Sequence, residues 1–155
     1  MVLTESSVHQ PVAGQARSRR RGGAAMEMAM IAPWAFLLFI GALDWGFYSY
    51  AVISLQAATR SAVLYTAGST ATSTDSATAC TIVLGELRNL PNIGSTVTTC
   101  GSNPVVTATS VTGPDSAAAA QVSVRYQTIR MIPLPGLLTN QFTITRTAKM
   151  RLRKP

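Results

Sequence analysis

The sequence predicts an α+β fold, in which one long N-terminal helix packs against a small antiparallel β-sheet domain. Three observations carry this prediction. Apolar residues, which make up 47% of the chain, concentrate between Gly23 and Leu55. Serine, threonine and alanine dominate from Thr66 to Ala120. Closer to the C-terminus, apolar and polar residues alternate as they do in half-buried strands.

Residues 1–22 are expected to form a basic cytoplasmic leader. Most of this segment lacks apolar periodicity, which is typical of disorder. Four arginines stand directly before the apolar segment: Arg17, Arg19, Arg20 and Arg21. Positive charge beside a membrane helix marks its cytoplasmic side, so we interpret the run as a topology signal and expect no nucleic-acid partner.

Residues 24–45 are predicted to cross a membrane once. The 16 residues from Met28 to Leu43 carry no charge. The wider run from Ala24 to Leu43 has the length of about 20 residues that a bilayer core requires, with Glu27 as its single charge. Because the basic residues lie before this segment, we expect the N-terminus in the cytoplasm and the remainder outside.

The helix is expected to continue past the membrane and to cover residues 23–68. One face repeats at a spacing of three and then four residues: Leu55, Ala58, Ala62 and Tyr65. This spacing is helical, and Gly68 with the Ser/Thr cluster after it predicts the end. Pro33 removes one backbone donor, which predicts a bend near Ala29.

Residues 69–155 are predicted to form an extracytoplasmic α+β domain. A second helix is expected, because residues 73–78 offer helix caps, apolar residues repeat at helical spacing from Cys80 to Leu90, and Pro91 ends the pattern. β-Rich segments then cover residues 95–100, 104–111, 120–132 and 142–153, and we expect three or four strands. In the last segment Arg146 interrupts an otherwise apolar face. The basic residues near the C-terminus are expected to be solvated or to protect a sheet edge.

The two cysteines, Cys80 and Cys100, are predicted to form a disulfide, because an even number in an exported domain favours pairing. Two buried free thiols are the alternative. His9 is the only histidine and lies in the leader, so no zinc site and no cofactor are expected. The acids of this domain fall in separate turns and helices, so we expect no enzyme.

Glu27 and Asp44 are the acids of the apolar region. Glu27 is costly at the edge of a membrane unless it is paired. A cut between Gly22 and Gly23 would make it the fifth residue, close to the new amine of a neighbouring subunit. The alternative is that the carboxylate of Glu27 simply reaches the membrane surface and has no partner. Spacing alone favours neither explanation over the other. For Asp44 we favour the outer membrane boundary over a helix-packing contact.

The segment RRRGGAAMEMAMIAPWAFLLFIGALDWGFYSY resembles the N-terminus of TadE-like pseudopilins, which belong to tight-adherence (Tad, or Flp) pilus systems. The matching positions are Gly22, Ala24, Ala25, Glu27, Pro33, Gly41, Asp44, Trp45 and Gly46. Asp44 stands where the family usually has Glu, and Met28 where it has Phe or Tyr. The C-terminal block VSVRYQTIRMIPLPGLLTNQFTITRTAKMRLR also resembles the family's closing hairpin, whereas residues 69–118 match least.

The resemblance implies a pilin-like fold and a non-enzymatic minor pilin that supports pilus assembly at the bacterial cytoplasmic (inner) membrane. It assigns prepilin peptidase cleavage to Gly22 and Gly23, and the subunit register to Glu27. The implied partners are other pilins and pseudopilins, the peptidase, the inner-membrane assembly platform and membrane lipid. The alternative is a single-pass, membrane-anchored binding domain unrelated to pili.

Overall fold

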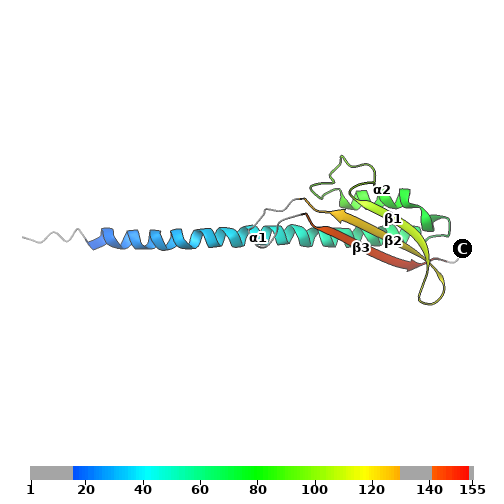
Figure 1. Cartoon of the computed structure of the whole chain (residues 1–155), viewed down its shortest axis with the longest axis horizontal. Helices are drawn as coiled ribbons and strands as arrows, with labels where there is room; N and C mark the ends of the chain where they lie inside the picture. The colour runs from blue at the N-terminus through cyan, green and yellow to red at the C-terminus, as the bar shows by residue number, and fades with distance from the viewer. Residues whose placement is uncertain (1–15, 130–140, 154–155) are drawn as a thin grey trace, which may run out of the picture. The chain divides into compact units, whose positions relative to one another are not determined.

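The computed structural model describes residues 16–129 and 141–153, except for the side chains of residues 16–22. The chain divides into two compact units, Met1–Ile40 and Gly41–Pro155. A single helix, α1, supplies the described part of the N-terminal unit and continues into the C-terminal unit. The second unit also contains α2 and the strands β1, β2 and β3 (Figure 1).

Helix α1 covers Ala16–Thr66, a run of 51 residues. It begins earlier than predicted, so residues 16–21, which we expected to be disordered, are helical. Alanine and arginine favour helices, and extending an existing helix is much easier than starting one. The stretch Gly23–Thr66 is long and apolar enough to cross a membrane. The leader boundary and the membrane limits at residues 24 and 45 stay predictions.

The end of α1 agrees with the sequence prediction. The amide of Ala67 donates to the carbonyl of Val63, and that of Gly68 donates to the carbonyl of Tyr65 at 3.0 Å. A Cβ atom on residue 68 would stand 3.1 Å from the Tyr65 oxygen, which is closer than most side chains tolerate. Glycine therefore allows the chain to turn sharply here.

Helix α2 covers Ser76–Leu87, so it begins within the predicted capping segment and ends a little earlier than predicted. Asp75 is its N-cap, and its Oδ1 atom accepts a hydrogen bond of 3.0 Å from the amide of Thr78. A short 3₁₀ helix, η1 at Thr72–Thr74, precedes it. Leu90 follows in a turn, where its amide donates to the carbonyl of Leu87.

Three antiparallel strands form one sheet in the order β1-β2-β3. They cover Val105–Thr112, Ala118–Gln127 and Thr143–Arg151, which confirms the predicted small sheet. The linking segment IPLPGLLTN lies outside the described residues.

The strand predicted at residues 95–100 was wrong. This segment consists of turns and irregular structure. Gly94 has a positive φ of 53°, and the hydroxyl of Thr96 bonds locally to the carbonyl of Ile93. Val97 is the apolar side chain of this segment that packs on the core, together with Cys100. The segment therefore lacks an apolar face that a place in the sheet would bury.

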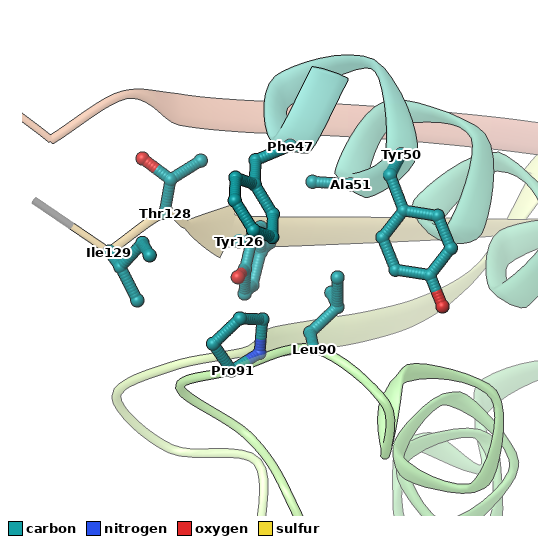
Figure 2. A pocket seen from close by; sticks show the side chains of 8 residues that line it. All are labelled: Phe47, Tyr50, Ala51, Leu90, Pro91, Tyr126, Thr128 and Ile129. Atoms are coloured by element: carbon teal, nitrogen blue, oxygen red, sulfur yellow. The ribbon is translucent and has the colours of Figure 1, made fainter. Parts of the chain in front are cut away.

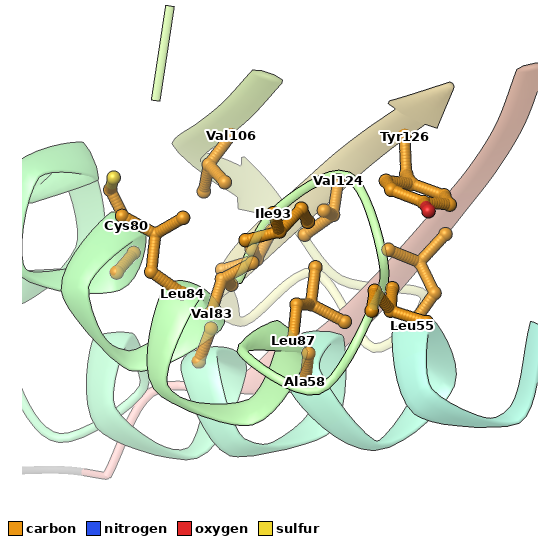
Figure 3. Close-up of a cluster of buried hydrophobic side chains, with 14 of the residues drawn as sticks. Leu55, Ala58, Cys80, Val83, Leu84, Leu87, Ile93, Val106, Val124 and Tyr126 are labelled. Atoms are coloured by element: carbon orange, nitrogen blue, oxygen red, sulfur yellow. The ribbon is translucent and has the colours of Figure 1, made fainter. Parts of the chain in front are cut away.

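The core lies between one face of the sheet and the two helices. Leu55 and Ala58 of α1, Leu87 of α2 and Val124 of β2 are completely buried, and Tyr126 is nearly so. Figure 3 shows these side chains converging from the three elements. The C-terminal half of α1 thus packs against the sheet, as the sequence predicted.

Candidate processing and assembly site

Gly22, Gly23 and Glu27 all lie within α1. Glu27 follows Gly23 by four residues, about one helical turn and 6 Å along the axis. Its side chain is exposed. The carboxylate therefore stands within one turn of the peptide bond that cleavage would open, on a helix surface that a second chain can reach.

The apolar part of the N-terminal unit has no cover of its own. Every side chain at residues 23–39 is exposed, including Trp34 at 72% and Leu38 at 75%. A helix that is apolar on all sides requires lipid or neighbouring helices around it. Helix α1 continues through Pro33 without a break. The bend near Ala29 stays a prediction.

Asp44 belongs to the C-terminal unit and is only 5% exposed. Its Oδ2 atom is buried and has no hydrogen-bond partner among the residues that the structure describes. This burial favours the packing contact over the membrane boundary that the sequence led us to prefer. The position of Asp44 relative to a bilayer stays a prediction.

The predicted Cys80–Cys100 disulfide is present in the structure. It joins the buried side of α2 to the irregular segment that precedes β1, across a separation of 20 residues. The bond thus attaches a stretch that contributes few side chains to the core.

Sequence reasoning missed a polar hollow between α1 and β3, which we call the arginine hollow. Its volume is about 400 Å³. Its lining comprises Gln56, Thr59, Arg60, Arg146, Thr147 and Ala148. The only signal in the sequence was Arg146, which interrupts the apolar face of its strand. Nothing local indicated that Arg60, far away in the chain, would lie at the same place.

A second hollow is apolar and small, with a volume of about 20 Å³. Phe47 and Tyr50 of α1 border it together with Leu90, Pro91 and Tyr126 (Figure 2). That volume holds about one water molecule, so the hollow does not accommodate a substrate.

The groups with shifted pKa values serve structural purposes. Hydrogen bonds from Thr78 lower the pKa of Asp75, with help from the hydroxyl of Tyr65. Burial raises the pKa of Tyr126, although its hydroxyl also bonds to the side chain of Asn92. Asn92 in turn donates to the carbonyl of Gln127. Asp75 and Tyr126 thus each connect segments of the fold through hydrogen bonds, and their two hydrogen-bond networks are separate.

Residues 22–64 match the family model described as TadE-like protein. This segment is TadE-like. The match confirms the resemblance of the N-terminal motif, from Gly22 through Glu27 and Pro33 to Asp44. It covers less than a third of the chain, and the resemblance of the C-terminal block stays a prediction. No curated protein and no solved structure matches the chain.

The TadE-like family that this segment matches is a pilus-associated structural family. The apolar helix fits a single-pass membrane anchor. Both findings agree with an N-terminal unit whose surface requires lipid or protein around it.

Proposed function

We propose that the chain is a minor pilin, or pseudopilin, that supports assembly of a Tad/Flp pilus in a structural role. The observation that carries the proposal is the TadE-like match, which includes Gly22, Gly23 and Glu27 at the start of an exposed apolar helix. An α+β unit built on the same helix supplies the pilin-like body.

We place the chain in the bacterial cytoplasmic membrane, with the leader in the cytoplasm and the C-terminal unit outside. The arginines before the apolar segment support this orientation, because positive charge is retained on the cytoplasmic side. The disulfide supports it as well, since such bonds persist in oxidising compartments.

Processing by a prepilin peptidase would occur between Gly22 and Gly23, inside α1. Two adjacent glycines weaken a helix by about 1 kcal/mol each relative to alanine, so this turn is easier to unwind than its neighbours. Cleavage would leave Gly23 as the new helix N-terminus. Glu27 would then lie at the positive end of the helix dipole, where a carboxylate is favourable.

In this proposal Glu27 pairs with the amine of Gly23 on a neighbouring subunit and sets the stagger between helices. Its partners are other pilins and pseudopilins of the same pilus, the peptidase, the inner-membrane assembly platform and membrane lipid. A membrane-anchored binding domain unrelated to pili would require neither the cut nor the pairing.

The decisive measurement is the intact mass of the protein purified from a host that contains the matching peptidase. We expect a mature chain that begins at Gly23. Gly22→Val should block the cut. Gly41→Ala is the matched control, because it lies far from the cut and a Cβ at residue 41 meets nothing within 4 Å, so cleavage should continue. Retention of Met1 in the unaltered chain, or a cut beyond Gly41, would overturn the proposal.

A further inference from the structure

Helix α1 carries an exposed stripe along the part that belongs to the C-terminal unit. The stripe comprises Gly46, Tyr50, Ile53, Ala57, Arg60 and Leu64, and we call it the α1 seam. These positions are separated by four and three residues in turn, a spacing typical of helices that pack side by side. Ile53 is 66% exposed and Leu64 is 58% exposed. Ala58 and Ala62, from the core-facing side of the same helix, are fully buried.

Arg60 is the one charged residue of this seam, and it also borders the arginine hollow. Arg146 reaches the hollow from β3, the edge strand of the sheet. The described lining of the hollow includes no carboxylate. Two guanidinium groups on one polar hollow favour an anion between them, and the planar guanidinium fits a carboxylate especially well.

The acids of the C-terminal unit lie outside the lining of the hollow in the described structure. Asp75 caps α2. Glu86 accepts a hydrogen bond from the hydroxyl of Ser61, and Asp115 forms an ion pair of 3.1 Å with Arg151. Asp44 is buried. None of these described carboxylates lines the hollow, which leaves it open to a carboxylate of another molecule.

We propose that the arginine hollow binds a carboxylate side chain on a helix of a different pilin-like subunit, which packs along the α1 seam. The inference rests on the proposed function, because subunits anchored in one membrane present parallel helices. The apolar residues on both sides of Arg60 favour a helix over a soluble anion. A second copy in the same register would place Arg60 against Arg60, so the seam disfavours self-pairing.

Protection of the sheet edge is the competing explanation for Arg146, since inward-pointing charges keep edge strands from pairing with other chains. That explanation does not involve Arg60, which lies on a helix. An experiment that changes the two arginines separately therefore distinguishes the two roles.

The test uses the full-length chain as its own partner. Two differently tagged versions, both with Ala57→Cys, are produced together in a bacterial membrane and treated with a short bismaleimide. One version keeps Arg60, and the other carries Arg60→Glu and so presents a carboxylate on the seam. We expect the mixed pair to cross-link about tenfold more than either version with itself, which corresponds to about 1.4 kcal/mol.

Two matched controls locate the effect. Arg88→Glu makes the same charge change at an exposed residue outside the seam and hollow, and it should give no gain. In the version that keeps Arg60, Arg146→Ala should lower mixed cross-linking severalfold, whereas Arg125→Ala, on the outward face of β2, should leave it unchanged.

Several outcomes would overturn the inference. Equal cross-linking of mixed and like pairs, an equal gain from Arg88→Glu, or no effect of Arg146→Ala would each do so. Binding of polygalacturonate to the unaltered chain in micelles, lost in both Arg60→Ala and Arg146→Ala, would identify a glycan site instead. The cross-linking does not depend on cleavage at Gly22, so its failure is distinct from failure of the proposed function.

Discussion

Val124 of β2 lies directly opposite Arg146 of β3 in the antiparallel register, yet Val124 is completely buried and Arg146 is exposed. Both positions belong to the side of the sheet that faces the helices, as does Ile144, which is buried. The hydrophobic core thus ends between these two residues, with Val124 inside it and Arg146 in the lining of the arginine hollow.

This boundary predicts that truncating Val124 and truncating Arg146 have unequal effects on stability. Val124→Ala removes buried apolar groups and should lower the free energy of unfolding by about 2 kcal/mol. Arg146→Ala alters an exposed side chain and should change it by no more than about 0.5 kcal/mol. Thermal unfolding of the full chain in detergent micelles, followed by near-ultraviolet circular dichroism, measures both. Comparable losses for the two variants would place Arg146 inside the core and contradict this account.

Removal of the disulfide should destabilise the C-terminal unit. The Cys80–Cys100 bond spans a separation of 20 residues, and closing a loop of this size contributes about 3 kcal/mol in the chain-entropy model. The double variant Cys80→Ala, Cys100→Ala should therefore unfold at a clearly lower temperature. The unaltered chain under reducing conditions is the matched comparison. A non-reducing peptide map that recovers both cysteines as free thiols would refute the bond itself.

Asp75 makes the stability of the C-terminal unit depend on pH. Its pKa in the folded chain lies below the ordinary value of 3.8, chiefly because of hydrogen bonds from Thr78. A lowered pKa means that the charged form stabilises the fold above that value, and that this contribution disappears as the pH falls through the folded pKa. Asp75→Asn should thus melt at a lower temperature than the unaltered chain at pH 7, and the difference should shrink as the pH falls below the ordinary pKa of an aspartate.

A matched carboxylate-to-amide change serves as the control for Asp75. Asp115→Asn breaks an exposed ion pair with Arg151, which contributes little because water screens it. Its effect at pH 7 should be smaller than that of Asp75→Asn. An Asp75→Asn variant whose difference from the unaltered chain persisted unchanged at low pH would show that the charge of Asp75 is irrelevant.

The sequence predicted those elements whose pattern is repeated over several turns or residues. Leu55, Ala58 and Ala62 identify the buried face of α1 because helical spacing is regular. Val122, Val124 and Tyr126 identify the inward face of β2 because strands alternate. Residues 95–100 misled, because β-branched residues favour extended structure even where no apolar face is available to bury. The start of α1 was missed because no amphipathic pattern marks a helix that extends into a charged segment.

The candidate site divides in the same way. Gly22, Gly23 and Glu27 are close in sequence, so spacing alone placed them within about one and a half helical turns. Arg60 and Arg146 line the same hollow only because β3 returns alongside α1. Just beyond the ends of these two elements, the amide of Arg153 donates to the carbonyl of Ala67 at 2.9 Å. Such a meeting depends on the register of the whole sheet, which single-sequence patterns do not specify. The burial of Asp44 was likewise not indicated by the sequence around it.

The Glu27→Gln variant tests the role of Glu27 in assembly. Glutamine preserves the shape of the side chain and removes its charge, so membrane insertion should be intact or slightly improved. Cleavage between Gly22 and Gly23 should also continue, because the cut lies upstream. Loss of one partner from a buried ion pair costs about 3–5 kcal/mol, enough to prevent incorporation into the pilus apparatus.

Cells with Glu27→Gln should therefore accumulate processed, membrane-inserted subunits and fail to make normal pili. Electron microscopy of the cells and the mass of the membrane-bound protein measure the two outcomes together. Glu27→Asp is the matched variant, because it retains the charge on a shorter side chain and should restore part of the assembly. Pili at normal levels in Glu27→Gln cells would show that the carboxylate only reaches the membrane surface, and that another contact sets the register between subunits.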